Sequence, residues 1–461
     1  MSSLKPVKLI ADHALLPEGW ARQVAISIDP AGRIGSVQSG ATGSPDAIQC
    51  GVLLPALANV HSHSFQRALA GLTESRGPTA HDSFWTWREL MYRFLAHLTP
   101  DDVQAIGAFV FMESLKAGYA AIGEFHYLHH QADGTPYADL AEMAGRLAAA
   151  AAQSGIGLTL LPVLYQQGGC DGRALVGGQR RFANTTDRFA RLHSASAAAV
   201  SQIAADCVTG VAPHSLRAVT REALGQMVSL APHAPIHLHI AEQTAEIDEV
   251  QAAYGMRPVH WLLEHHPVTA RWCLVHATHM TEQETLALAA SGAVVGLCPI
   301  TEANLGDGIF NASMFLAGGG RMAIGSDSNV RISLVEELRL LEYSQRLRDR
   351  SRAVLASAEH STGRVLYAEA ARGGAQALGR EAGLIAPGQL ADLIALDVDS
   401  TDLAGLHGDT LLDTYLFAGS DGLITDVWSA GRHVIKGGKH AQAAAITRDY
   451  RRTIDRLRAL L

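Results

Sequence analysis

The chain has 461 residues, of which 48% are hydrophobic and 18% charged, so it can bury a large core and extensive disorder is excluded. Its 37 Lys and Arg against 45 Asp and Glu give a net charge of −8, which argues against a protein that holds nucleic acid or an anionic membrane through bulk charge. The five cysteines form no C-x-x-C pair, and no apolar run resembles a signal peptide or a membrane span. We therefore expect a soluble, cytoplasmic protein.

The two ends of the chain share one pattern of short β pieces separated by turns. In the first fifty residues, the apolar run 24–28 precedes the turn 29–32, and near the other end the runs 388–396 and 427–434 are broken by glycine turns. The two ends therefore predict one small β-sandwich domain, composed of residues 1–52 and 382–461.

Between the two ends, short apolar runs alternate with longer helical patterns, which is typical of β/α units with a parallel sheet. Strands are predicted at residues 53–60, 120–125, 157–164, 207–213, 236–240, 272–275, 293–297 and 322–325. Ala- and Leu-rich segments such as 140–152 and 282–290 supply helices between them. This α/β pattern predicts a (β/α)8 TIM barrel over residues 53–381, and enzymes with such a barrel carry their catalytic residues at the carboxyl ends of the strands.

The segment 70–101 is long for a loop after the first barrel strand, and it contains the aromatic motif FWTWR at residues 84–88. Long loops at this face of a barrel usually serve the active site. We therefore expect this segment to form part of the substrate pocket.

Histidines and carboxylates lie where four predicted strands end. His61 and His63 follow the first strand, and residues two apart on a strand point to the same side, so both imidazoles can reach one metal. The other members follow the fifth, sixth and eighth strands: His239 with Glu242, His276, and Asp327. Because barrel enzymes place their chemistry at these strand ends, the set predicts a metal-dependent active site.

The residue types indicate a hydrolytic reaction. Three neutral imidazoles and one carboxylate suit a divalent transition metal such as zinc, although ligand type leaves zinc and iron both open. Metal-bound water with a pKa of about 7 becomes hydroxide at neutral pH, and Glu242 can take the proton of this water and return it later. His276 is expected to hydrogen-bond the attacking oxygen or the electrophile. No lysine ends a strand where it could bridge two metals, which favours one metal.

These residues resemble the amidohydrolase superfamily, in which H-x-H follows strand one and further histidines and an aspartate follow strands five, six and eight. The segment GLIAPGQLADL at residues 383–393, in the β domain built from both ends, is also similar to that superfamily. The mononuclear deaminase branch fits best because the bridging lysine is missing. The resemblance covers essentially the whole chain.

Four longer motifs resemble the formimidoylglutamate deiminase family: NVHSHSFQRALAG at 59–71, FWTWRELMY at 84–92, EFHY at 124–127 and APHSLR at 212–217. Members of that family degrade histidine by converting N-formimino-L-glutamate and water to N-formyl-L-glutamate and ammonia. The resemblance implies a homodimer in which zinc-bound hydroxide attacks the formimino carbon. The implied metal ligands are His61, His63, His239 and Asp327. The implied catalytic residues are Glu242, His276 and Asp327, and the implied substrate contacts are Gln66, Arg88, Tyr127, His214 and Arg217.

The residues support this substrate independently, because N-formimino-L-glutamate carries two carboxylates that arginine side chains match. Arg88 lies in the long first loop and Arg217 follows strand four, so both can face one pocket. The alternatives are deamination of guanine, cytosine or an adenosine derivative by another mononuclear-zinc amidohydrolase, triazine dechlorination, and a non-catalytic ligand-binding barrel. His237 is expected in the core, and a role for His279 in the site stays open.

Overall fold

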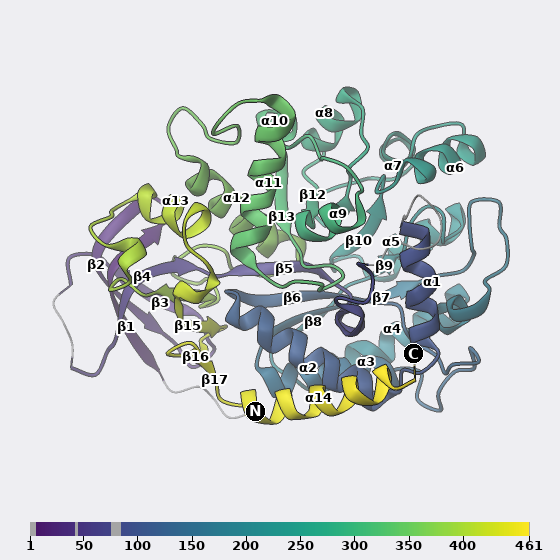
Figure 1. Ribbon diagram of the computed structural model, residues 1–461, viewed down its shortest axis with the longest axis horizontal. Helices are drawn as coiled ribbons and strands as arrows, with labels where there is room; N and C mark the ends of the chain where they lie inside the picture. Colours follow the sequence, from purple (N-terminus) through teal and green to yellow (C-terminus); the bar gives the residue numbers. More distant parts are fainter. Residues whose placement is uncertain (1–5, 42–44, 75–83, 461) are drawn as a thin grey trace.

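The structure, a computed structural model, describes residues 6–41, 45–74 and 84–460, without the side chains of residues 84–89. It combines an eight-stranded sheet with a set of parallel strands surrounded by helices (Figure 1). No helix in these ranges is long and apolar enough to cross a membrane.

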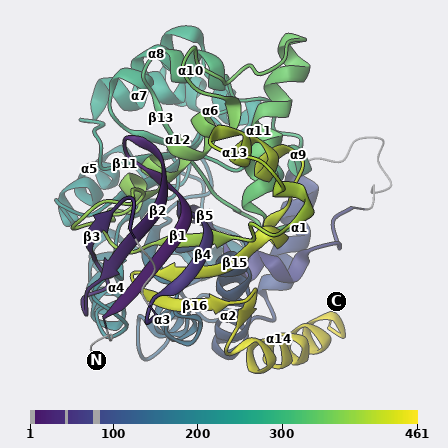
Figure 2. The same ribbon diagram turned by 90° about the vertical axis from the view of Figure 1, so that its left-hand side faces the viewer.

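Strands from both ends of the chain form the eight-stranded sheet, in which early and late strands lie side by side (Figure 2). Its members are β1 (Val7–Leu16), β2 (Gly19–Ile28), β3 (Ile34–Gln38), β4 (Ile48–Pro55), β14 (Leu393–Leu396), β15 (Ile424–Ser429), β16 (Arg432–Lys436) and β17 (Lys439–His440). Their order is β17-β16-β15-β14-β4-β1-β2-β3. Apolar side chains such as Leu9, Ile26 and Trp428 form a core of this sheet. The predicted joining of the two ends in one β unit is confirmed, as a single continuous sheet.

The middle of the chain carries the parallel strands. They are β5 (Leu57–Ser62), β6 (Tyr119–His126), β7 (Gly157–Leu164), β8 (Val208–Thr209), β9 (Ala212–Pro213), β10 (Ile236–Ile240), β11 (Trp272–His276), β12 (Val294–Leu297) and β13 (Arg321–Ile324). Parallel pairing joins β5 through β8 and β10 through β13, while isolated parallel bridges join Val211 to Ile236 and Ser62 to Asp327. The carboxyl ends of β5 and β13 therefore lie next to each other.

Two predicted strands differ from the structure in their limits. The prediction 53–60 combines the end of β4, which belongs to the eight-stranded sheet, with the start of β5. The prediction 207–213 corresponds to two short strands, β8 and β9, both paired with β7. Continuous apolar runs hide these breaks, because periodicity alone does not show where a strand changes partner.

Helices connect and cover the strands. They are α1 (Phe84–Leu95), α2 (Pro100–Lys116), α3 (Glu142–Ser154), α4 (Thr186–Val200), α5 (Arg221–Leu230), α6 (Thr244–Tyr254), α7 (Pro258–His265), α8 (Glu282–Ala290), α9 (Pro299–Leu305), α10 (Ala312–Ala317), α11 (Leu334–Asp349), α12 (Thr362–Ala377), α13 (Asp409–Phe417) and α14 (Ala443–Arg458), with short 3-10 helices η1 (Ser64–Leu69), η2 (Gly177–Phe182), η3 (Thr401–Leu403) and η4 (Asp421–Leu423). Several begin at a threonine whose hydroxyl accepts an amide hydrogen bond, as Thr99 does for α2 and Thr281 for α8.

Two segments contain helices that the sequence reading did not predict. Part of the expected loop 70–101 is α1, where Met91, Phe94 and Leu95 are buried at helical spacing. Residues 382–461, predicted as part of the β-sandwich, include α13 and α14. α14 packs along α2 (Figure 1), where the ring of Tyr450 stacks on Phe109 at a centroid distance of 3.9 Å.

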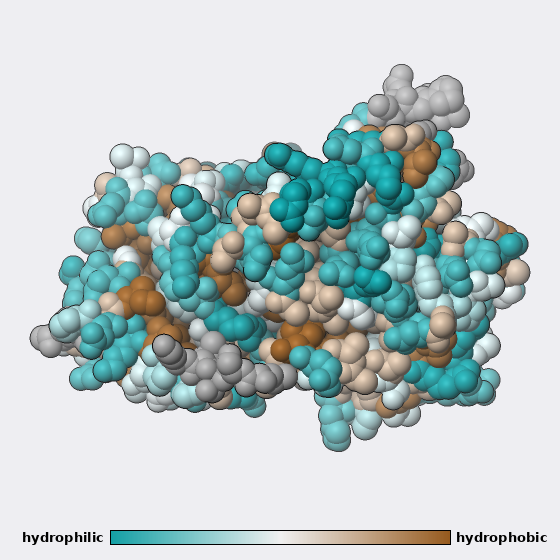
Figure 3. All heavy atoms as spheres, turned by 90° about the horizontal axis from the view of Figure 1, so that it is seen from below, coloured by the Kyte–Doolittle hydropathy of each residue, from teal (hydrophilic) through white to brown (hydrophobic). Residues whose placement is uncertain are grey.

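The face of the molecule that carries α14 is mostly hydrophilic, and its apolar residues lie in small separate patches (Figure 3). Arginines of α14, namely Arg448, Arg451 and Arg452, are exposed to solvent. This alternation of buried apolar and exposed basic residues explains why α14 forms a surface helix.

A buried ion-pair network joins the eight-stranded sheet to the rest of the chain. Arg432 of β16 lies 2.6 Å from Asp206, which precedes β8, and Arg380 lies 3.2 Å from the same carboxylate. Arg380 also pairs with Asp392 at 2.9 Å. Although burial favours the neutral acid, the two arginines lower the pKa of Asp206. Breaking this network is expected to destabilise the contact between the two parts.

Candidate active site

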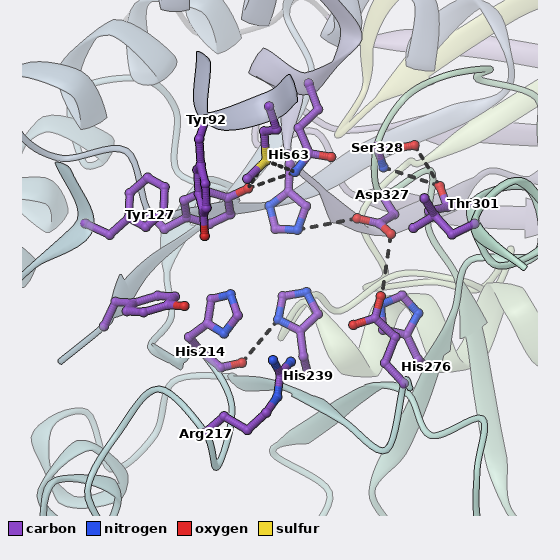
Figure 4. Close-up of a pocket in the computed structure, with 16 residues that line it drawn as sticks. His63, Tyr92, Tyr127, His214, Arg217, His239, His276, Thr301, Asp327 and Ser328 are labelled. Carbon is purple, nitrogen blue, oxygen red and sulfur yellow. Dashed lines mark hydrogen bonds and ion pairs between the residues drawn. The ribbon is translucent and has the colours of Figure 1, made fainter. Parts of the chain in front are cut away.

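The backbone brings the H-x-H motif next to Asp327. The amide of Asp327 donates to the carbonyl oxygen of His61 at 2.9 Å, and the amide of His63 donates to the carbonyl oxygen of Asp327 at 2.9 Å. The carboxylate Oδ1 of Asp327 lies 3.5 Å from Nε2 of His61 and 3.4 Å from Nε2 of His63. Residues from the first and last parallel strands therefore share one site (Figure 4).

Three imidazole nitrogens converge at this site. Nε2 of His61 lies 3.1 Å from Nε2 of His63 and 3.0 Å from Nε2 of His239. His63 directs Nδ1 to the carbonyl oxygen of Phe125 at 3.0 Å, and His239 directs Nδ1 to the carbonyl oxygen of His214 at 3.1 Å. Those carbonyls accept hydrogen bonds only, so they fix the proton of His63 and His239 on Nδ1 and leave the Nε2 lone pairs of these two rings facing Nε2 of His61.

The electrostatics of this group fit a cation. Burial lowers the pKa of His61 to about 3, and it also lowers the pKa values of His63 and His239, so all three are neutral at pH 7. Burial opposes ionisation of Asp327, but contacts with the histidines hold its pKa below the usual range. Neutral nitrogens with facing lone pairs repel one another, whereas nitrogens bound to zinc at about 2.0 Å lie about 3.3 Å apart. The donor set therefore fits one divalent metal.

Glu242 and His276 lie beside the imidazole group. Nε2 of His276 is 3.7 Å from Glu242 Oε1 and 4.0 Å from Asp327 Oδ2. Nδ1 of His276 is 3.2 Å from Oε1 of Glu302, a buried residue of α9. Burial alone would lower the pKa of His276, but Glu242 and Glu302 raise it to about 10. The pKa of Glu242 is raised, chiefly by burial. His276 can thus donate a hydrogen bond, and Glu242 can exchange a proton.

Glu302 was missed by the sequence reading. It is the fourth residue of α9, where an acidic side chain also suits the helix dipole, so its position carries no signal of a catalytic partner. Its carboxylate accepts from the amide of Cys298 at 2.9 Å and faces His276. The contact arises only because the start of α9 folds back against the end of β11.

Backbone strain accompanies the functional strand ends. Ala241, His276 and Asp327 have positive φ values of 53°, 69° and 45°. Such conformations in non-glycine residues cost about 1 kcal/mol or more each and cluster at active sites. They direct the functional side chains out of the regular strand geometry and into one space.

A buried amide network supports the metal-ligand segments. Asn59 Nδ2 donates to Ser326 Oγ at 2.6 Å, and Ser326 Oγ donates to Asn329 Oδ1 at 2.6 Å. Asn329 Nδ2 in turn donates to the carbonyl oxygen of Asp327 at 2.9 Å and to Ser62 Oγ at 3.1 Å. The sequence analysis missed this network, although Asn59 lies two residues before His61 and Ser326 directly precedes Asp327. It holds the two segments in register.

One cavity brings together most of the predicted site residues (Figure 4). It is lined by His63, Gln66, Tyr127, His214, Arg217, His239, Glu242, His276 and Asp327 among the predicted set. His61 lies behind them and reaches the group through Nε2. Arg88 belongs to α1, but its side chain lies outside the described residues. Gln66 Nε2 donates to the hydroxyl of Tyr127 at 2.8 Å, which orients both side chains.

Arg217 is an arginine that lines this cavity, and Figure 4 shows it beside His214 and His239. It is 13% exposed, and its Nη2 lies 4.0 Å from Glu246 Oε2. Burial would lower the pKa of Arg217, but Glu246 and Glu242 raise it, so the guanidinium stays charged. Its Nε is buried without a hydrogen-bond partner in the described part of the chain. Arg217 can therefore take up a carboxylate.

The cavity also has lining residues that the sequence analysis did not single out: Met91, Tyr92, Tyr165, Phe182, Thr301, Leu305 and Ser328. Phe182 contacts the rings of Tyr127 and Tyr165 at centroid distances of 4.7 and 5.6 Å. Tyr92 and Met91 come from α1. Because these residues lie on separate segments, no local pattern marks them as one wall.

Arg181 ties two parts of this wall together. Its guanidinium is buried and donates to the carbonyl oxygens of Leu95, at the end of α1, of Leu98 at 3.1 Å, and of His130 at 2.8 Å. Arg181 therefore links the end of α1 to η2, whose last residue is Phe182. Its backbone carbonyl also accepts hydrogen bonds from two consecutive amides after β6.

Two further histidines lie away from the cavity lining. His237 is buried, and its Nε2 pairs with the carbonyl oxygen of Ala377 at 2.8 Å, which confirms the expected core position. His279 pairs through Nε2 with the carbonyl oxygen of Asp307 at 2.8 Å. Both rings therefore have structural hydrogen bonds.

Comparison with known families matches residues 52–434 to the amidohydrolase family and residues 9–47 to the N-terminal domain of formimidoylglutamate deiminase HutF. The chain is 50% identical over 436 residues to formimidoylglutamate deiminase of Pseudomonas aeruginosa, covering 94% of this chain and 95% of that protein. Both resemblances found in the motifs are thereby confirmed.

Solved structures agree with the family matches. An amidohydrolase from Brucella melitensis has a TM-score of 0.94 and 48% identity, covering 98% of this chain and 99% of that one. An adenosine deaminase from Xanthomonas campestris with bound zinc has a TM-score of 0.81 at 23% identity, covering 98% of each chain, and at that identity it shows a shared fold only.

Proposed function

Because the chain belongs to the amidohydrolase family, we propose that it hydrolyses N-formimino-L-glutamate to N-formyl-L-glutamate and ammonia. The observation that carries this proposal is one cavity with the imidazole group on one side and the buried Arg217 on another. The first suits hydrolysis of a C–N bond, and the second suits an acidic substrate. The relative from Pseudomonas aeruginosa bears the name of this activity.

The residues that would hold a divalent metal are His61, His63, His239 and Asp327, and we propose that the metal is zinc. Support comes from the convergent Nε2 atoms and from the zinc bound in the related fold. When bound, the metal would polarise the attacking water and lower its pKa. The carbonyl partners of His63 and His239 keep these rings in the tautomer that a metal requires.

Arg217 would bind a substrate carboxylate through its fork of N–H donors. Gln66, Tyr127 and His214 would orient the rest of the substrate, since they line the same cavity. Arg88, which the resemblance implies as a substrate contact, would bind the other carboxylate and completes the proposed set. This arrangement directs the formimino carbon towards Asp327, Glu242 and His276.

Glu242 and His276 would handle the protons of the reaction. Glu242, with a raised pKa, takes a proton from the attacking water and delivers it to the departing nitrogen. Asp327 accepts a hydrogen bond from the same water. His276 donates a hydrogen bond from Nε2 while Glu302 holds its other nitrogen. The second proton of the water also reaches this nitrogen through Glu242, the C–N bond to that nitrogen breaks, the water oxygen becomes the formyl oxygen, and ammonia leaves.

The rival activity, deamination of a nucleobase, calls for amide and aromatic partners along a ring edge. Aromatic side chains are present in the cavity, but the buried charge of Arg217 favours an anionic substrate. The test is ammonia release by zinc-loaded protein from N-formimino-L-glutamate, with guanine, cytosine and S-adenosylhomocysteine in parallel. Release from formimino-glutamate alone, abolished by a chelator, is the expected result, and release from a base would refute the substrate.

We extend the proposal to the organisation of the chain. Residues 53–381 would form a (β/α)8 barrel that carries catalysis, and residues 1–52 with 382–461 a β-sandwich. Support comes from the parallel pairing from β5 to β13 and from the sheet shared by both ends. A cytoplasmic homodimer, which the family resemblance implies, completes the proposal, and sedimentation measurements test the dimer.

A further inference from the structure

A second group of metal-ligand atoms lies beside the three imidazoles. One carboxylate oxygen each of Glu242 and Asp307 and one ring nitrogen of His276 lie within 4.8 Å of one another, and all three residues are buried. His276 presents Nε2 to Glu242 at 3.7 Å because its Nδ1 faces Glu302. We call these three residues the Glu242–His276–Asp307 group.

Asp307 brings an unsatisfied oxygen to this group. Its Oδ1 accepts a hydrogen bond from Nε2 of Gln243, whereas Oδ2 is buried without a hydrogen-bond partner among the described residues. Only 5% of Asp307 is exposed. Burying a carboxylate oxygen without a hydrogen-bond donor costs free energy, because the oxygen loses its hydration and gains no partner. A bound cation would offset that cost.

A neighbouring group shows the contrast. His276, Cys298 and Glu302 also bring ligand atoms together. However, Glu302 Oε1 already accepts from His276 Nδ1 at 3.2 Å and from the Cys298 amide at 2.9 Å. Burial also raises the pKa of the Cys298 thiol well above its usual value. Glu302 Oε1 therefore already has hydrogen-bond donors, whereas Asp307 Oδ2 has none among the described residues.

Negative charge accumulates around Asp307. Burial together with the charge of Glu242 raises the pKa of Asp307 to about 8, although His276 opposes this effect. Glu302 and Asp327 add further negative charge. Two carboxylates and one imidazole nitrogen are ligands that zinc and similar cations accept. A divalent cation would thus supply positive charge that balances the buried carboxylates.

We propose that the Glu242–His276–Asp307 group is a second, weaker divalent-cation site, and that filling it inhibits the enzyme. The site is weaker because three residues form it, no lysine bridges it to the first site, and the cation must displace the protons that His276 and Asp307 hold at pH 7. A cation held by Glu242 and His276 stops both from exchanging protons. The inhibition rests on the proposed function, whereas the cation site does not.

The test counts bound zinc and measures activity on the same protein. Apoprotein is dialysed against increasing free Zn²⁺, and we expect one tightly bound equivalent followed by a second at higher concentration. Ammonia release from N-formimino-L-glutamate should rise with the first equivalent and fall with the second. A single equivalent throughout, with no inhibition by excess zinc, overturns the proposal.

Variants assign the second site. Asp307→Asn keeps the shape but cannot ionise to a carboxylate, so we expect one tight equivalent, ordinary basal activity and an inhibitory zinc concentration raised by about tenfold. Asp399→Asn, at an exposed position, is the matched control and should behave like the unaltered protein. Unchanged zinc inhibition in Asp307→Asn refutes the assignment.

A second variant, Glu242→Gln, tests the site independently if Asp307→Asn fails to fold. Glu242→Gln loses turnover but should also bind only one tight equivalent, which zinc counting alone detects. Two equivalents in the unaltered protein without any ammonia release would refute the proposed function and leave the cation site standing. Two equally tight equivalents in Glu242→Gln would overturn the site.

Discussion

Replacing Arg217 with methionine should weaken substrate binding more than it slows the chemistry. The side chain is 13% exposed, so a carboxylate bound there is largely shielded from water. A charge-assisted pair of this kind contributes about 3 kcal/mol, which corresponds to about a hundredfold in kcat/KM. Because the carboxylate lies away from the formimino carbon, most of the loss should appear as a higher KM.

Steady-state ammonia release from N-formimino-L-glutamate measures this effect. Arg217→Lys keeps the charge but loses the planar fork, so its KM should lie between those of the unaltered protein and Arg217→Met. Arg221→Met is the matched control, because Arg221 stacks over Tyr254 at 4.1 Å and does not line the cavity. Its KM should be unchanged.

Substituting Glu246, the partner of Arg217, distinguishes the role of Arg217 in substrate binding from its role in stability. Removing the guanidinium strands the buried carboxylate of Glu246, whose side chain is 1% exposed, so Arg217→Met should also lower Tm. Adding Glu246→Gln should restore Tm without restoring KM. An unaltered KM in Arg217→Met, or recovery of KM in the double variant, would show that Arg217 serves only to neutralise Glu246.

Three further predictions concern other parts of the molecule. Glu242→Gln should keep one tightly bound metal and lose about 10²-fold or more in kcat, and normal turnover would refute its role as proton carrier. Asp206→Asn should destabilise the protein by about 3 kcal/mol in urea unfolding at pH 7, because it breaks a buried pair with Arg432. The lowered pKa of Asp206 adds stability above its unfolded pKa, and this is lost as the pH falls through the folded value, so the difference between the two proteins should shrink in acid. Arg181→Met removes three hydrogen bonds to carbonyl oxygens, so thermal unfolding should show a loss of about 3 kcal/mol, with a raised KM.

Much of the candidate site follows from local patterns. A strand places residues two apart on one side, so the spacing of His61 and His63 is visible without coordinates. Parallel strands end at the same edge, so His239, His276 and Asp327 could be grouped from the apolar runs before them. The same patterns predicted the joining of both ends in one β unit, since each end repeats short strands and glycine turns.

Other features depend on contacts between distant segments, which no local pattern records. Glu302 looks like an ordinary helix-start acid until α9 folds against the end of β11, and the open oxygen of Asp307 becomes visible only once its hydrogen bonds are known. The helix α14 was not predicted, because its apolar residues pack against α2 and the sequence of α14 alone does not show that contact. Periodicity reports which face a segment buries, whereas packing in three dimensions decides what that face meets and which polar atoms remain unsatisfied.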